Sequence, residues 1–66
     1  MATFDFVLIG SHIPQRVEVP ADNLAKLADY IAGGRFIEGE MPPDDWGEIR
    51  RVLIPTSRIQ MVVESD

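Results

Sequence analysis

The sequence contains no cysteine and only one histidine, His12. Without cysteine the chain has no disulfide, no thiolate ligand for zinc and no thiol nucleophile. A small domain usually compensates for its thin core with disulfides, a bound metal or partner subunits. The first is absent and a lone histidine argues against the second, so we expect no cofactor and no metal. We predict stabilisation by close packing or by oligomerisation.

Long apolar runs are also missing, and the longest is the four-residue segment from Phe6 to Ile9. A membrane-spanning helix needs about 20 apolar residues. The first residues carry no basic cluster and Asp5 precedes the apolar run, a pattern unlike that of a secretory signal. We therefore expect a soluble, cytoplasmic protein that does not associate with a membrane.

Basic residues are few, with 6 Lys and Arg against 11 Asp and Glu, so the formal net charge is −5. Affinity for a phosphate backbone comes largely from Lys and Arg contacts, so this balance disfavours a general nucleic-acid binder. The 45% of hydrophobic residues is typical of a globular protein and not of a disordered chain. A chain of 66 residues has room for one domain, residues 1–66.

Hydrophobic patterning predicts five strands. Residues 3–9 are rich in aromatic and β-branched side chains, and residues 16–19 alternate polar and apolar, so these two strands form a hairpin around a Gly- and Pro-containing turn. Further strands are predicted at residues 35–41, 48–54 and 57–64. Gly39 weakens the third strand or marks a bulge. In the fifth strand, alternation places Ile59, Met61 and Val63 on one face.

Between the second and third strands the apolar period changes from two to 3.6, which indicates a helix. Its apolar stripe consists of Leu24, Leu27, Ala28 and Ile31. Asp22 and Asn23 suit the N-terminus of this helix, and Gly33-Gly34 suits its end. The order ββαβββ predicts an α+β domain with a mostly antiparallel, twisted sheet and one amphipathic helix.

Several strands carry apolar side chains on both faces, as Val7 and Ile9 do opposite Phe4 and Phe6. Leaving such side chains in water forfeits about 1.5–3 kcal/mol each. One helix can cover only one face of the sheet. Either the sheet curls into a small barrel or its open face packs against another copy of the chain, and we hypothesise a homo-oligomer.

The segment from Leu53 to Ile59 places Pro55 and polar residues between two apolar strands. It resembles the end of SH3-like and Sm-like small barrels, in which a strand breaks at a short 3₁₀ turn and resumes. The resemblance covers this short segment and implies a curled sheet. No functional residue follows from it.

The single tryptophan, Trp46, lies in an acidic loop that also contains two prolines, residues 42–47. A tryptophan exposed in a loop is often a hot spot for a protein partner. Alternatively, the indole folds back and covers the core. We predict Asp44 and Asp45 as binding residues beside it, although acidic residues also favour turns and solubility.

Five of the six basic residues are arginine. The candidate binding residues among them are Arg16, Arg35, Arg50 and Arg58. Two or three guanidinium groups on one face would bind a phosphate or carboxylate through paired hydrogen bonds. Alternatively, each arginine pairs with a nearby carboxylate at the surface. The first arrangement is the basis of an alternative function, a nucleotide- or nucleic-acid-binding module.

No catalytic motif is present, so we do not expect an enzyme. His12 has no positioned partner, the serines lie in turns without a nucleophile elbow, and Gly33-Gly34 lacks the spacing of a phosphate-binding loop. The acidic residues between positions 38 and 48 lack the ligand order of a calcium loop. Our leading hypothesis is a small oligomeric protein that binds another macromolecule. Its size and charge are compatible with an accessory or inhibitor protein of phage or bacterial type.

Overall fold

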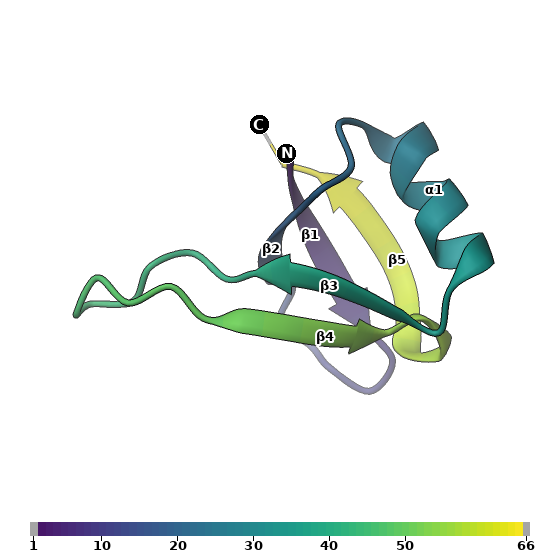
Figure 1. Cartoon of the computed structure of the whole chain (residues 1–66). Coiled ribbons are helices and arrows are strands. Elements are labelled where there is room, and N and C mark those ends of the chain that lie inside the picture. Colours follow the sequence, from purple (N-terminus) through teal and green to yellow (C-terminus); the bar gives the residue numbers. More distant parts are fainter. Residues whose placement is uncertain (1, 66) are drawn as a thin grey trace.

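The computed structural model describes residues 2–65 and contains one antiparallel sheet and one helix (Figure 1). Its elements are β1 (Ala2–Leu8), β2 (Gln15–Val19), α1 (Leu24–Gly33), β3 (Phe36–Glu40), β4 (Arg51–Pro55), the 3₁₀ turn η1 (Thr56–Arg58) and β5 (Ile59–Glu64). The predicted α+β order is confirmed. The 3₁₀ turn lies within the segment that resembles small barrels.

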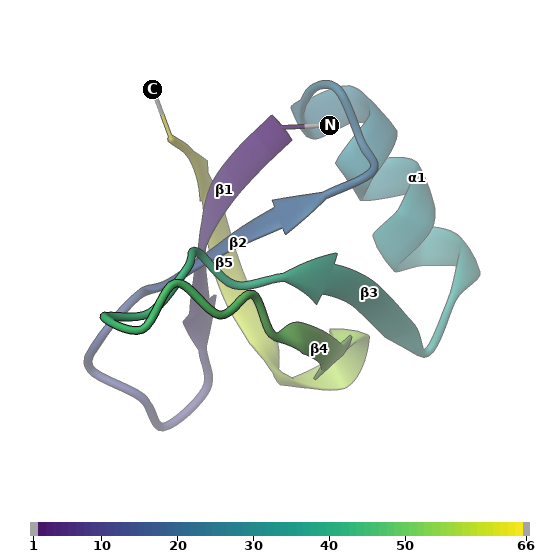
Figure 2. The same cartoon turned by 60° about the vertical axis from the view of Figure 1, so that its left-hand side comes forward.

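The five strands follow the order β4-β3-β2-β1-β5, so β4 and β5 form the two edges of the sheet. The sheet is strongly bent, as Figure 2 shows, and β2 meets β3 where Glu18 pairs with Glu40. Within residues 2–65, β4 and β5 are not paired with each other. The sheet therefore curls around its core but does not close into a barrel.

The core lies on the inner side of the bend, where α1 covers it (Figure 1). Alternate residues of β1 and β2 are buried, as the period of two predicted. Among residues 2–65, the buried side chains are those of Phe4, Phe6, Val17, Val19, Ala21, Leu27, Ile37 and Ile54. All of them are apolar, so the fold depends on hydrophobic packing between the two halves of the sheet and the helix.

Gly39 lies in β3 at a point where β2 is close by. A Cβ added at this position would lie 2.5 Å from Cγ1 of Val17 and 2.8 Å from the carbonyl oxygen of Glu18. Both distances are shorter than ordinary van der Waals contact, so a side chain would push the strands apart. The register with β4 is regular at Gly39, so the glycine marks no bulge there, and its missing side chain allows the two halves of the sheet to meet.

The helix follows its predicted pattern in part. Asn23 caps it, because its side-chain oxygen accepts a hydrogen bond from the Lys26 amide at 2.9 Å. Leu27 is buried and Ile31 is half-buried against the core, whereas Leu24 is exposed. Fewer residues of the helix therefore contact the core than the apolar stripe of the sequence predicts.

A bulge changes the faces of β5. Val7 is opposite Met61 and Leu8 is opposite Ile59, so Gln60 is an extra residue in the ladder. Ile59 therefore packs against the core, while Met61 and Val63 stay exposed on the outer face. The prediction that Ile59 shares a face with the other two is wrong, because alternation does not survive a bulge.

The strand ends differ from the prediction mainly at β4, which begins at Arg51 and not at Glu48. After β4, the Thr56 hydroxyl donates hydrogen bonds to the carbonyl oxygens of Gly34 (2.9 Å) and Arg35 (3.1 Å). These bonds tie η1 to the start of β3.

Within residues 2–65, no helix is both long enough and apolar enough to cross a membrane.

Candidate functional site

Residues 42–50, here called the hairpin extension, project from the body of the protein beyond β3 and β4 (Figure 1). At its base, the Met41 amide donates to the Arg50 carbonyl at 2.8 Å. At its tip, the Gly47 amide donates to the Asp44 carbonyl at 2.9 Å, and Gly47 has a φ of +78°. A positive φ suits glycine, so this residue permits the tight turn.

The Asp44 carboxylate holds this turn in shape. Its Oδ1 accepts hydrogen bonds from the amides of Trp46 (2.9 Å) and Glu48 (3.0 Å). Its Oδ2 lies 3.8 Å from Nη2 of Arg50. Two predicted binding residues, Asp44 and Arg50, are therefore engaged with each other and with the backbone of the hairpin extension.

Trp46 occupies the tip of the hairpin extension and is 88% exposed. The alternative in which the indole covers the core is wrong, since the hydrogen-bonded turn points it into solvent. Asp45, the neighbouring residue, is also exposed. The protein thus presents a large apolar side chain with an adjacent carboxylate on a turn that is fixed by local hydrogen bonds.

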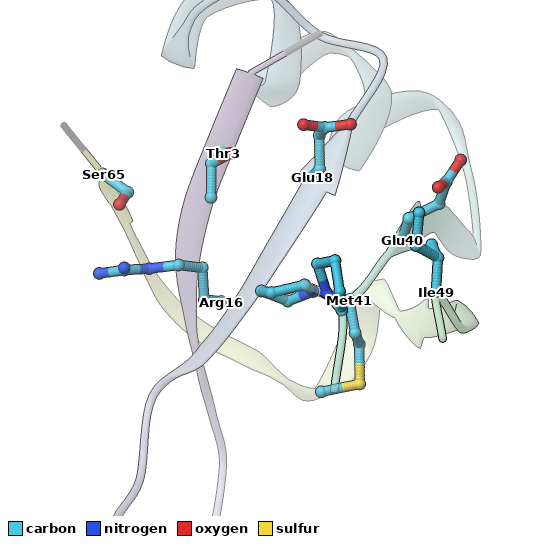
Figure 3. A pocket seen from close by; sticks show the side chains of 9 residues that line it. Thr3, Arg16, Glu18, Glu40, Met41, Ile49 and Ser65 are labelled. Atoms are coloured by element: carbon cyan, nitrogen blue, oxygen red, sulfur yellow. The ribbon is translucent and has the colours of Figure 1, made fainter. Parts of the chain in front are cut away.

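A pocket of about 360 Å³ lies between the base of the hairpin extension and the outer face of β1 and β2 (Figure 3). It is lined by Thr3, Arg16, Glu18, Glu40, Met41, Pro42, Pro43, Ile49 and Ser65. Arg16 extends across β1 (Figure 3), and its Nε donates to Oδ1 of Asp5 at 3.1 Å. The pocket has two walls. The apolar wall is formed by the hairpin extension and its base, and the charged wall is formed by the sheet.

The charged wall carries one carboxylate from β2 and one from the end of β3. Glu18 and Glu40 are direct cross-strand partners, and both line the pocket. Like charges in this position destabilise a sheet. Neither carboxylate has an ion-pair partner within residues 2–65. Together with the exposed Asp45 and Glu48, they make this side of the protein acidic, which favours contact with a cationic group.

The four candidate arginines do not gather at one site. Arg35 and Arg50 lie at opposite ends of the β3–β4 ladder, because their carbonyls accept from Thr56 and Met41, respectively. Arg16 lines the pocket and is paired with Asp5, as described above. Arg51, which was not a candidate, lies 3.9 Å from Glu38.

Arg58 belongs to η1, and its carbonyl accepts from the Ile9 amide at 2.8 Å. Neither Arg58 nor Arg35 forms an ion pair within the part of the chain that the structure describes. The arginines therefore form single ion pairs or stand alone, and the described residues contain no cluster of guanidinium groups in one pocket.

A second groove, which we did not predict from the sequence, lies between α1 and β3. Its volume is about 390 Å³, and Tyr30 and Phe36 line it with Asp29 and Glu38. Both aromatic side chains are more than half exposed. The sequence contained one indication of this groove, because Tyr30 lies outside the apolar stripe of the helix and is therefore expected to point away from the core. The outward direction of Phe36 depends on the register of β3, which the sequence does not show.

His12 is exposed in the loop between β1 and β2. Within residues 2–65, no group of three or more His, Cys, Asp or Glu residues is arranged to hold a metal ion.

Comparison with known protein families, with curated proteins and with solved structures finds no match for this chain. The functional argument therefore rests on the surface of the protein itself.

Proposed function

We propose that this chain is a small oligomeric binding protein whose hairpin extension recognises a basic surface of another protein. The observation that carries this proposal is the 88% exposure of Trp46 on a turn held by Asp44. In this role the chain would act as an accessory or inhibitor protein. The cytoplasmic location expected from the sequence belongs to the same proposal, and cell fractionation tests it.

Energetics support Trp46 as the anchor. An aromatic side chain of this kind buries about 150–250 Å² at an interface. At about 25 cal/mol per Å² of apolar area, this contributes several kcal/mol before the costs of association. The turn is already held by Asp44, so little ordering of the backbone is needed when a partner binds.

Charge supports a basic protein as the partner. Asp45 and Glu48 flank the tip, and the unpaired Glu18 and Glu40 lie in the pocket at its base. Lys or Arg side chains of a partner would relieve the repulsion between these carboxylates. A phosphate backbone would meet repulsion on the same surface, and no observation favours the alternative function in nucleotide or nucleic-acid binding.

The test isolates the intact protein with its partners, without cross-linking, from the cell that produces it, and identifies the partners by mass spectrometry. We expect Trp46→Ala to remove at least one protein that the wild type retains, and we expect high salt to weaken its retention. Phe36→Ala is the matched control, because it removes an exposed aromatic side chain from a different surface. Partners that are unaffected by Trp46→Ala, or copurifying nucleic acid in their place, would contradict the proposal.

A further inference from the structure

The two edge strands of the sheet differ in how they are protected. A sheet edge presents unpaired N–H and C=O groups, and proteins usually block it with proline, charged side chains or bulges. In β4, Arg51 is charged and Pro55 lacks an N–H group. In β5, the bulge at Gln60 affects only the start of the strand and the charged Glu64 is its last residue, so residues 61–63 carry neither proline nor charge. The free edge of β5 is therefore the less protected one.

The register of β5 shows which groups its edge offers. The Ser65 amide donates to the Thr3 carbonyl at 3.2 Å, and Val63 is paired with Asp5. Hydrogen bonding alternates along an antiparallel ladder, so the N–H groups of Val62 and Glu64 point away from β1. On the outer face, Met61 and Val63 are 54% and 45% exposed. The free edge thus combines available donors with exposed apolar side chains.

We propose that β5 pairs antiparallel with β5 of a second copy of this chain, about a two-fold axis that is perpendicular to the sheet and passes between the two Val62 residues, so that Met61 of each copy lies opposite Val63 of the other on the outer face. The inference rests on the oligomeric state in the proposed function but not on Trp46. The two sheets would become one continuous sheet, and the exposed Met61 and Val63 side chains of both copies would cover one another.

The single charge of β5 favours this arrangement over parallel pairing. Glu64 is the only charged residue of β5. Antiparallel pairing about Val62 places Glu64 of one copy opposite the uncharged Gln60 of the other, away from its Glu64. Parallel pairing in register would place the two carboxylates side by side, which costs stability. Pairing between two β4 strands would lose a hydrogen bond at Pro55, because proline has no N–H group to donate.

The first test is the mass of the intact protein by sedimentation at concentrations from about 10 µM to about 1 mM. A single pair of strands is smaller than the standard interface of about 1,200–2,000 Å², so we expect a dimer that dissociates on dilution. Met61→Lys should raise the dimer dissociation constant about tenfold or more, because it adds a charge at each half of the interface. Leu53→Lys is the matched control on β4, where Leu53 is 64% exposed on the outer face, and it should leave the mass unchanged.

The second test is amide hydrogen exchange at low and high protein concentration. We expect the amides of Val62 and Glu64 to become protected as the dimer forms, while the edge amide of Leu53 stays unprotected. A monomer throughout the concentration range would overturn the proposal. Protection of Leu53 together with Val62, and dissociation by both lysine variants, would also overturn it, because that result indicates head-to-tail pairing of β4 with β5.

These outcomes are separate from those of the proposed function. Trp46→Ala should leave the dimer intact, since Trp46 lies at the tip of the hairpin extension and not on β5. Met61→Lys should keep the circular dichroism spectrum of the folded protein, because Met61 is exposed and outside the core. A wild-type protein that stays monomeric but binds a partner through Trp46 would contradict only the pairing of β5. A wild-type dimer whose partners do not depend on Trp46 would contradict only the proposed role of the hairpin extension.

Discussion

Gly39 and Trp46 belong to the same β-hairpin but lie in opposite surroundings. At Gly39 the chain is so crowded by β2 that a single added carbon would clash. At Trp46, only a few residues later, the largest side chain of the protein is almost fully exposed. The base of the hairpin is positioned by contacts with a distant part of the chain, whereas its tip is positioned by hydrogen bonds between near neighbours.

This difference separates the residues that determine the fold from those that are available for binding. Contacts at the base connect the two halves of the sheet, so changes there should affect the whole protein. Contacts at the tip are local, so changes there should affect the hairpin extension or a partner and leave the core intact. The following substitutions test this separation, beginning with the largest expected effect on stability.

Gly39→Ala should lower the free energy of unfolding most, by about 1–3 kcal/mol, because the new methyl group meets Val17 and the Glu18 carbonyl. Thermal denaturation should show a midpoint lower by about 4–8 °C per kcal/mol for a domain of this size. Gly33→Ala is the control, because an added Cβ at Gly33 in α1 meets nothing within 4 Å. A wild-type midpoint for Gly39→Ala would mean that β2 and β3 are not constrained at this crossing.

Asp44→Ala should have a smaller effect, about 1 kcal/mol, since it removes hydrogen bonds to two backbone amides. The loss should be confined to the hairpin extension, with faster hydrogen exchange at Trp46 and Glu48. Asp44→Asn keeps an oxygen acceptor and should retain much of the protection. If the exchange of core amides rises as much as that at the tip, then the hairpin extension does not unfold independently of the body.

Glu18→Gln should stabilise the protein by about 0.2–1 kcal/mol, because it removes the repulsion between the cross-strand partners Glu18 and Glu40, while the other cross-strand partner of Glu18 is the uncharged Thr3. Denaturant unfolding at low and high salt measures this gain, which should shrink as salt screens the charges. Glu38→Gln, in which the removed carboxylate lies 3.9 Å from Arg51, should give no gain. Equal stabilisation by both variants would mean that the effect comes from the net charge of the protein and not from the cross-strand pair of Glu18 and Glu40.

Trp46→Ala should change the free energy of unfolding least, within about 0.5 kcal/mol, because its side chain is outside the core. Since Trp46 is the only tryptophan, the fluorescence of the wild type should also change little on unfolding, whereas circular dichroism should report the transition. A large fall in the midpoint of Trp46→Ala would assign the indole to packing and remove the main support for its role in binding.

The sequence by itself determined the order of the elements, because that order depends on local periodicity. A period of two marked the strands, a period of 3.6 marked α1, and the cap at Asn23 follows from a side chain that acts on nearby backbone. It also indicated Trp46 and its acidic loop as a candidate site. Binding by Trp46 stays a prediction, and its exposure is what the structure adds.

Only the tertiary structure decided which faces and sites result from these elements. The bulge at Gln60 moved Ile59 to the core, Gly39 was required by the approach of β2, and the candidate arginines were placed at separate positions. Each of these depends on the register between strands that are distant in sequence. Periodicity shows that a strand has two faces, but pairing with a particular neighbour decides which face is buried, because register is set by long-range packing.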